Sequence, residues 1–368
     1  MDSKVSSSVQ TFATLTSEQL RQWQELADSL EANFSLSPGW IEITARSHDI
    51  IDDVEVLTAT SGQELLAAMP VIFSKARSCG VPLKILELVG NYVSYHHSLV
   101  TRLEAHDALR LVLDFAKSRR ADVVHFAGVE DDSGLVEALR LADVRGESTV
   151  HRLPGEASPY LRLNLGWDAL VASQPKKFRY KLRKREEALS SSGRLSMRWY
   201  SAPHDSPDLL MAMQRIEGSS WKQNAGVAIF ARPQETRYHE LLIPFLAQQR
   251  ALVANVLFSR DVPIAYNLCC LRNGWMGQLK TSFDASHAAL SPGATVIDQV
   301  IRKAIELNAH EFDFLGDMDP HKLAWTKTIR THSDYYLYSR SSLRGRLIGG
   351  AKRMRDIMRS VRERLSVQ

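Results

Sequence analysis

Residues 277–325 read GQLKTSFDASHAALSPGATVIDQVIRKAIELNAHEFDFLGDMDPHKLAW. This segment predicts a strand, a turn at 291–295, a helix, a second strand and a polar loop. Apolar side chains recur at helical spacing after the turn, at Val296, Ile297, Val300, Ile301, Ala304, Ile305 and Leu307. Residues 311–315 alternate as a strand does, and Gly316 ends it.

The turn predicts a helix start with free N–H donors. Ser291 is a good N-cap residue, and Pro292 suits the first helical position because its missing N–H would have been unpaired there. The N–H groups of Gly293, Ala294 and Thr295 point out of such a helix start, where aligned peptide dipoles favour a phosphate or diphosphate. We therefore predict a cofactor-binding site at Ser291, Gly293, Ala294 and Thr295. Ordinary helix-cap chemistry is the alternative reading of the same residues.

The order of these parts resembles the core of the GNAT acyltransferases, in which the diphosphate of an acyl-coenzyme A lies on that helix start. In detail the chain resembles the Fem-type branch, and within it the acetyltransferases associated with cellulose biosynthesis. The motifs that carry the resemblance are the basic run 175–185 followed by Leu189 and Gly193; Trp221-Lys222 with Gly226 and Phe230; Val-Pro-Ile-Ala at 262–265, with Asp261 in place of the usual glycine; and Phe-Asp-Phe-Leu-Gly at 312–316 followed by His321, Lys322 and Trp325, with His321 where tyrosine is common.

The resemblance covers most of the chain and implies an α/β (α+β) fold of tandem GNAT-like domains with Fem-type architecture. Each domain is expected to be a mixed, mostly antiparallel sheet flanked by helices. A chain of 368 residues is long enough for two such cores. Residues 154–159 (PGEASP) are rich in turn formers and predict the connection. We predict a degenerate N-terminal GNAT-like domain at 1–155, a GNAT acyltransferase domain at 156–340, and a basic amphipathic helix at 341–368.

Periodicity and breaker residues predict the individual elements. In the first half we expect helices at 17–33, 41–48 and 106–119 and strands at 54–60, 64–73, 83–89 and 123–127. In the second half we expect a strand at 160–163, helices at 170–190, 208–219 and 237–249, and strands at 251–259, 264–271 and 275–283.

The basic run is the first candidate site outside the turn. Seven of the eleven residues in 175–185 are lysine or arginine. Clustered arginines suit bidentate phosphate binding, so Arg179 and Arg183 are predicted to bind substrate, such as a sugar nucleotide, a lipid-linked phosphate or the 3'-phosphate of coenzyme A. A solvated basic face is the simpler reading. Nucleic-acid binding is a third, although only Phe178 and Tyr180 are interleaved aromatics.

The loop after residue 316 supplies the candidate catalytic residues. In Fem-type transferases the lysine of the matching motif is assigned to oxyanion stabilisation, and Lys322 holds that position here. A surface salt bridge to Asp317 or Asp319 is the alternative. Asp313 and Asp317 are candidates for a general base or for orienting the acceptor, and capping of the following turn is the alternative for Asp313.

Three further residues are predicted to bind substrate: the aromatics Trp221 and Tyr266, for which a core role is the alternative, and Lys280 on the strand before the turn. Cys269 and Cys270 are expected to be small buried hydrophobic residues, and nothing in the spacing supports a Cys–His pair with His287. The pair His96-His97 is only weak evidence for a metal site, so no metal is predicted.

Composition favours a cytoplasmic protein. Three cysteines cannot form a disulfide framework, the first eight residues lack the apolar core of a signal peptide, and no window reaches the roughly 18 apolar residues needed to cross a bilayer. Residues 343–365 combine an apolar stripe with many arginines. That segment is expected either to pack on the body of the protein or to contact a partner or the inner membrane face.

These observations predict an acyl-CoA-dependent N- or O-acyltransferase, with acetyl-CoA as the donor, that acts on a sugar, a polysaccharide precursor or a small metabolite. One alternative is aminoacyl transfer from aminoacyl-tRNA, which the Fem resemblance also implies. The other is a degenerate, non-catalytic acyltransferase fold that serves as a scaffold. The sequence leaves open the acyl group, the acceptor, the general base, the oligomeric state and the pathway.

Overall fold

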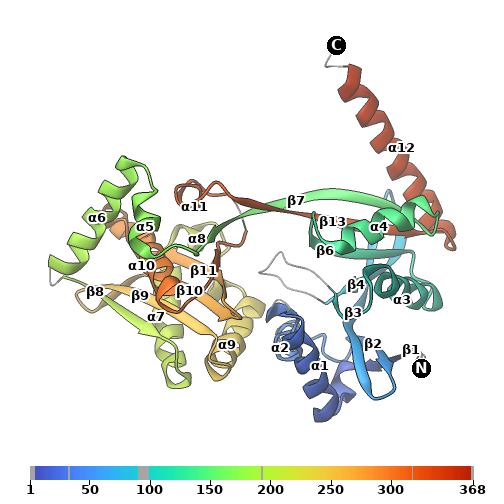
Figure 1. The fold of residues 1–368 in the computed structure, drawn as a ribbon, viewed down its shortest axis with the longest axis horizontal. Helices are drawn as coiled ribbons and strands as arrows, with labels where there is room; N and C mark the ends of the chain where they lie inside the picture. The colour runs from blue at the N-terminus through green and yellow to red at the C-terminus, as the bar shows by residue number, and fades with distance from the viewer. Residues whose placement is uncertain (1–4, 32–33, 90–98, 192–193, 317, 366–368) are drawn as a thin grey trace. The chain divides into compact units, whose positions relative to one another are not determined.

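The computed structural model describes residues 5–31, 34–89, 99–191, 194–316 and 318–365 (Figure 1). The chain divides into two compact units. Unit 1 consists of Met1–Glu156 and Thr331–Gln368, and unit 2 consists of Ala157–Arg330. Residues 341–368, which the sequence sets apart as a separate segment, fall within unit 1. Two long strands, β7 (Ser148–Arg162) and β13 (Ile329–Ser339), carry the chain from one unit into the other and back.

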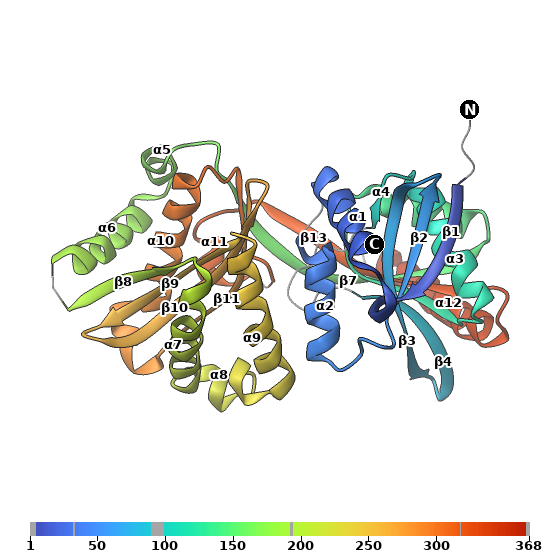
Figure 2. The ribbon, with the colours of Figure 1, turned by 90° about the horizontal axis from the view of Figure 1, so that it is seen from below.

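Unit 1 is a mixed sheet with helices on both faces. Its strands follow the order β1-β2-β3-β4-β6-β13, with the short β5 against β3, and the β4–β6 pair is parallel. Residues of α1 and α2 pack on one face of this sheet and residues of α3 and α4 on the other (Figure 2). The elements are β1 (Val5–Thr11), α1 (Ser17–Ser29), α2 (Pro38–Ser47), β2 (Glu55–Ser61), β3 (Glu64–Ser78), β4 (Val81–Leu88), β5 (Val100–Thr101), α3 (Ala105–Ser118), β6 (Val123–Glu130), α4 (Gly134–Val144) and α12 (Leu343–Leu365).

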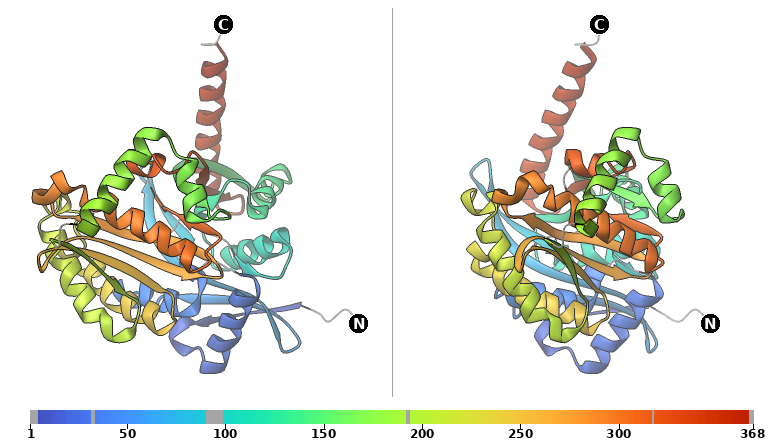
Figure 3. Two further views of the ribbon diagram at one scale, coloured as in Figure 1. Left: turned by 60° about the vertical axis from the view of Figure 1, so that its left-hand side comes forward. Right: turned by 90° about the vertical axis from the view of Figure 1, so that its left-hand side faces the viewer.

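Unit 2 has the same layering. Its strands follow the order β7-β12-β11-β10-β9-β8, and only β11 and β12 pair in parallel among its described strand pairs. In Figures 2 and 3, α5, α6 and α10 lie on one face of this sheet and α7 and α9 on the other. The elements are α5 (Trp167–Ala172), α6 (Lys176–Ser191), β8 (Leu195–Tyr200), α7 (Ser206–Gly218), α8 (Trp221–Asn224), α9 (Pro233–Gln248), β9 (Leu252–Ser259), β10 (Val262–Arg272), β11 (Trp275–Phe283), α10 (Pro292–Glu306), β12 (Glu311–Asp313) and α11 (Pro320–Leu323).

The two sheets repeat one topology. In unit 1, helix α3 connects the parallel pair β4 and β6, and in unit 2, helix α10 connects the parallel pair β11 and β12. The second strand of each parallel pair lies next to one of the two long strands that connect the units: β6 lies next to β13, and β12 lies next to β7. The residues at the N-cap positions of the two helices differ. Helix α3 begins after Glu104, whose carboxylate would repel an anion, whereas α10 begins after the neutral Ser291.

The structure corrects two predicted elements. Residues 154–159 do not form a turn but the middle of β7, where Gly155 permits close approach to β13: a Cβ there would lie 3.1 Å from the carbonyl oxygen of His332. The helix predicted at 170–190 is two helices, α5 and α6. The break occurs because Pro175 lacks an N–H and disfavours helical backbone at the residue before it.

Candidate active site

The start of α10 offers unpaired N–H donors. Ser291 occupies the N-cap position, but its side chain makes no capping hydrogen bond, so that part of the prediction is wrong. The reason is its left-handed backbone (φ 52°, ψ 45°), since side-chain caps need an extended backbone at this position. No described residue accepts a hydrogen bond from the N–H of Gly293 or Ala294. These donors, together with the helix dipole, favour an anion.

Thr295 does not belong to this group of donors. Its N–H and its hydroxyl both donate to the Ser291 carbonyl, each at 3.1 Å, and the residue is buried. The part of the predicted anion site that carries free donors is therefore Gly293 and Ala294. Thr295 fixes the turn that presents them.

A cleft opens beside this helix start because β11 and β12 separate. The parallel pairing joins 275–277 to 311–313 only, after which β11 continues to Phe283 paired with β10 but no longer with β12. The resulting space, which we call the β11 cleft, has a volume of about 520 Å³. Its walls include 278–283 of β11, 314–316 after β12, the α10 start at 291–294, and residues of α8 and α11. A strand edge without a partner thus faces the unpaired helix donors across one cavity.

A β-bulge lies in the strand that forms this wall. The β10–β11 register shifts so that Leu268 pairs with Lys280 and Cys269 with Gln278, which leaves Leu279 as the extra residue. A bulge removes one residue from the hydrogen-bond ladder and redirects neighbouring side chains. Gln278, Leu279 and Lys280 all line the cleft. The strand is therefore irregular where it borders the cavity.

Lys322 forms part of the opposite wall. It lies on α11, is only 8% exposed, and its Nζ donates to the Leu315 carbonyl at 2.8 Å. The residue is therefore a buried cation at the wall of the cleft. Asp319 lines the same cleft, and Asp317 lies outside the described residues.

Two more predicted residues, Trp221 and Lys280, also line the cleft. Trp221 is 58% exposed, and its neighbour Lys222 donates to the Thr281 carbonyl at 2.6 Å, which attaches α8 to β11. Lys280 is half-buried, and its backbone pairs with Leu268 of β10, but its ammonium group makes no hydrogen bond or ion pair with the side chains that the structure describes. Burial lowers the pKa of Lys280, opposed mainly by Glu235. An anionic group of a ligand would relieve that desolvation.

Two predicted residues are core residues instead. Tyr266 is fully buried, and its hydroxyl donates to Glu217 at 2.8 Å on the side of the sheet that α7 covers. Asp313 is fully buried as well, with one oxygen accepting from the Leu315 N–H and the other from Arg330. These contacts favour the structural alternative for both residues.

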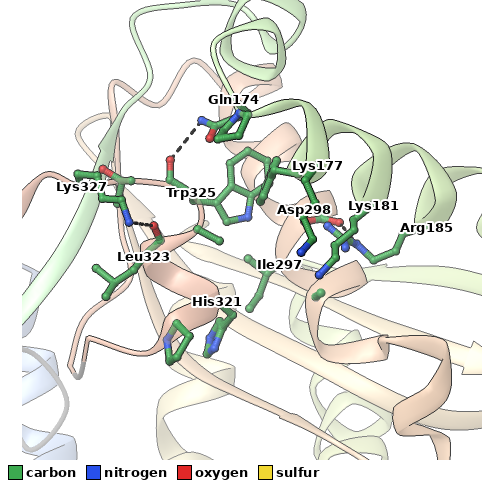
Figure 4. Close-up of a pocket in the computed structure, with 16 residues that line it drawn as sticks. Gln174, Lys177, Lys181, Arg185, Ile297, Asp298, His321, Leu323, Trp325 and Lys327 are labelled. Atoms are coloured by element: carbon green, nitrogen blue, oxygen red, sulfur yellow. Dashed lines mark hydrogen bonds and ion pairs between the residues drawn. The ribbon is translucent and has the colours of Figure 1, made fainter.

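A second cavity, the α6 pocket, has a volume of about 730 Å³ and adjoins the β11 cleft through Ala294, Ile297 and His321 (Figure 4). Three cationic residues, one helical turn apart on α6, line it: Lys177, Lys181 and Arg185. The rest of the lining is mixed: Trp325 packs edge-on against Phe178 at a ring-centroid distance of 4.8 Å, and polar residues such as Asp298 and Lys327 line it as well. The pocket is a basic, partly aromatic chamber next to the start of α10.

Arg185 forms an ion pair with the buried Asp298 at 2.5 Å. Burial raises the pKa of Asp298 to about 7, although Arg185 acts in the opposite direction. The predicted residues Arg179 and Arg183 are exposed and do not line this pocket, and Arg183 pairs instead with Glu187 at 3.9 Å. The sequence does contain a signal for the cations that face the pocket. Lys177, Lys181 and Arg185 are four residues apart, which places them on one face of a helix.

The cysteines do not form a nucleophilic site. Cys269 and Cys270 are buried, and burial raises the thiol pKa of Cys269 well above its usual value and that of Cys270 to about 12. His287 pairs with Asp284 at 3.1 Å. Among the described residues no group of three or more His, Cys, Asp or Glu side chains is placed to hold a metal ion, and the pair His96-His97 lies outside them.

Residues 176–323 match the family described as the acetyltransferase (GNAT) domain. Unit 2 contains a GNAT domain. The protein is thereby an acyltransferase. The matched GNAT residues begin with α6 and end with α11, so they include the start of α10, the β11 cleft and most of the α6 pocket. No curated protein matches the chain by sequence.

Solved structures that resemble this chain cover both units. FemX is 12% identical, with 89% of this chain and 96% of FemX covered and a TM-score of 0.61. L-PGS from Bacillus licheniformis is 12% identical, with 92% and 96% covered and a TM-score of 0.54. The C-terminal domain of a putative lysylphosphatidylglycerol synthetase from Agrobacterium fabrum is 11% identical, with 91% and 95% covered and a TM-score of 0.53. The predicted fold class, with Fem-type architecture, is confirmed.

Proposed function

We propose that unit 2 transfers an acyl group from an acyl-CoA to an amine or hydroxyl of a sugar, a polysaccharide precursor or a small metabolite. The observation that carries the proposal is the pair of unpaired N–H groups, at Gly293 and Ala294, beside the opening between β11 and β12. A diphosphate is the part of the donor that suits such a helix start. The repeated topology supports the accompanying inference that unit 1 is a second, degenerate GNAT-like half.

In this reaction the acceptor's nitrogen or oxygen attacks the thioester carbonyl carbon. The new C–N or C–O bond forms, the C–S bond breaks, and the proton given up by the acceptor is balanced by the proton that the departing sulfur gains, so that coenzyme A leaves as the thiol. The carbonyl oxygen carries negative charge in between. Lys322, a cation held at the cleft wall by the Leu315 carbonyl, suits the stabilisation of that charge.

The α6 pocket suits the phosphorylated end of the same donor. It adjoins the cleft at Ala294, and Lys177 and Lys181 reach into it from α6 (Figure 4). The 3'-phosphate of coenzyme A would place its charge among these cations. The two cavities together would then hold one extended ligand.

This arrangement predicts that the protein distinguishes coenzyme A from 3'-dephospho-coenzyme A. Lys181→Ala should weaken acetyl-CoA binding by roughly tenfold, the effect of losing one hydrogen bond to a charged group, and should leave the affinity for the dephospho form unchanged. Calorimetry with both ligands measures the difference. The matched control is Arg179→Ala on the exposed side of α6, for which we expect no change with either ligand. An equal loss for both ligands would remove the 3'-phosphate from the α6 pocket.

We further predict that Gly293→Val weakens donor binding by at least about tenfold, since a side chain at the helix start blocks close approach of the diphosphate. A Cβ at Gly293 would also lie 3.0 Å from the Phe283 ring, so the variant's thermal stability must be measured beside its donor affinity. Gly218→Val is the control, because a Cβ there meets nothing within 4 Å. Unchanged donor affinity in a folded Gly293→Val variant would count against the site.

Aminoacyl transfer from a charged tRNA is the second candidate, favoured by the exposed basic residues of α6: Lys176, Arg179, Arg183 and Lys184. A thermal-shift comparison of acetyl-CoA, longer acyl-CoAs and charged tRNA separates the donors. A ligand at one hundred times its dissociation constant adds about 2.7 kcal/mol to stability. Tight tRNA binding that falls steeply with salt, with a slope flattened by Arg179→Ala plus Arg183→Ala, would replace acyl-CoA as the donor.

A further inference from the structure

We propose that helix α12 binds the surface of an anionic lipid bilayer. The first observation is the way in which the helix contacts the rest of unit 1. Its small residues make the closest contact: a Cβ at Gly345 would lie 2.5 Å from the Ser339 carbonyl oxygen, and one at Gly349 would lie 2.7 Å from the Cβ of Tyr338. Two arginines also reach the rest of unit 1, Arg353 to Asp143 at 3.7 Å and Arg344 to the Pro82 carbonyl at 3.4 Å. Ile348 is the buried apolar residue on this side. The glycines therefore permit close helix packing without using the larger apolar side chains.

Those larger side chains lie on the opposite side of the helix. Leu343, Leu347 and Met354 are 65%, 60% and 60% exposed, and steps of four and seven residues place them in one stripe. In the sequence the same spacing continues with Met358, Val361 and Leu365. Figure 3 shows α12 extending away from the other elements of unit 1. The stripe therefore has no apolar partner among the described residues of its own unit.

The charges beside the stripe identify the partner. At 100° per residue, Arg344 and Arg355 fall on one flank of the stripe, and Arg346 and Arg353 fall on the other. The sequence repeats this arrangement with Arg362 and Arg364. A helix with an apolar stripe between two rows of arginines matches the boundary between acyl chains and anionic headgroups.

Two other partners fit less well. A second copy of α12 packed along the stripe would bring arginine rows against arginine rows, which is repulsive. Nucleic acid would use the arginines but leave the leucine stripe in water. No helix among the described residues is long and apolar enough to cross a membrane, so α12 would lie on the surface of the bilayer.

The test is co-sedimentation of the full chain with vesicles of phosphatidylcholine alone and of phosphatidylcholine mixed with phosphatidylglycerol. The wild type should bind only the anionic vesicles, and salt should weaken binding. Leu347→Glu with Met354→Glu should reduce binding by about 100-fold or more, the loss expected for two apolar side chains that no longer enter the lipid. Both residues are exposed, so the fold should be retained.

The matched control is Leu141→Glu with Val144→Glu on α4, which makes the same charge change at exposed apolar residues and should bind as the wild type does. Arg346→Gln with Arg355→Gln should reduce binding by about 30-fold, at about 1 kcal/mol for each arginine near an anionic surface. Failure of the wild type to bind anionic vesicles would overturn the proposal. So would unchanged binding by the glutamate variant, or tight RNA binding through the same arginines without vesicle binding.

Discussion

Replacement of Asp313 by alanine is expected to lower the free energy of unfolding by about 3 to 5 kcal/mol, the usual cost of removing one partner from a buried ion pair. Asp313 is fully buried and contacts the Arg330 guanidinium at 2.5 Å. Arg330 also packs over the Tyr160 ring at 4.4 Å, so the pair connects β12, β7 and the start of β13. Urea denaturation followed by circular dichroism measures the loss.

The neighbouring carboxylate provides the control for this prediction. Glu311 contacts Arg330 at 3.1 Å but is partly exposed, so Glu311→Ala should cost only about 1 kcal/mol. A general base would behave in the opposite way, since its removal would abolish turnover in a protein of normal stability. If Asp313→Ala unfolds at the wild-type urea concentration while turnover is lost, Asp313 is the base and the structural assignment is wrong.

The position of this ion pair explains why the cleft lies where it does. Asp313 is the last residue of β12, and its second oxygen accepts from the Leu315 N–H. The strand therefore turns away from β11 immediately after residue 313, and the free edge of β11 becomes a wall of the cavity. The buried Asp313 carboxylate thus lies outside the cleft but binds the backbone of Leu315, which is part of its wall.

Most elements with a strong period were predictable from sequence. The apolar stripe that begins at Val296 identified α10, and mainly apolar runs identified β9 and β10. Of β7 only the end was predicted, as a strand at 160–163. Its middle was predicted as a turn because Pro154, Gly155 and Pro159 give it that composition, whereas in the structure it is extended and lies close to β13. Elements β1, α4, β8 and β13 were not predicted from the sequence.

The sequence predicted part of the candidate site correctly, namely residues whose side chains face the cleft from loops, helix ends and the bulged part of β11. Trp221, Lys280, Gly293 and Lys322 do line one cleft, although a hundred residues separate the first from the last. To predict which way a side chain points from a strand or helix, one must know which face of that element is buried, and a single sequence leaves this open for mostly apolar strands. Tyr266 accordingly enters the core.

The same reasoning applies to α6. Its run of basic residues covers every side of the helix, so composition identifies a basic helix but not the face that meets a ligand. The face is set by Phe178 and Leu182, which pack inward and turn Lys177, Lys181 and Arg185 toward the pocket. Arg179 and Arg183 consequently point to solvent.

Lys322→Met is expected to reduce the turnover rate by roughly 100-fold or more, with little change in donor affinity. Methionine keeps much of the side-chain volume but removes the charge that would stabilise the negative oxygen of the intermediate. Lys322→Arg should not restore turnover, because a guanidinium places its donors differently and the 8% exposed site has little room for adjustment. The assay is acyl transfer to an identified acceptor, or slow hydrolysis of the donor in its absence.

The main competing explanation is that Lys322 only holds α11 to the end of β12 through its bond to the Leu315 carbonyl. Lys84→Met is the control, since Lys84 makes the same kind of bond to the Arg119 carbonyl at 2.9 Å and lines neither the β11 cleft nor the α6 pocket. A purely structural role predicts that Lys322→Met lowers stability and donor affinity together. A transition-state role predicts normal donor affinity, near-normal thermal stability and a loss confined to turnover, because the charge matters only when the oxygen becomes negative.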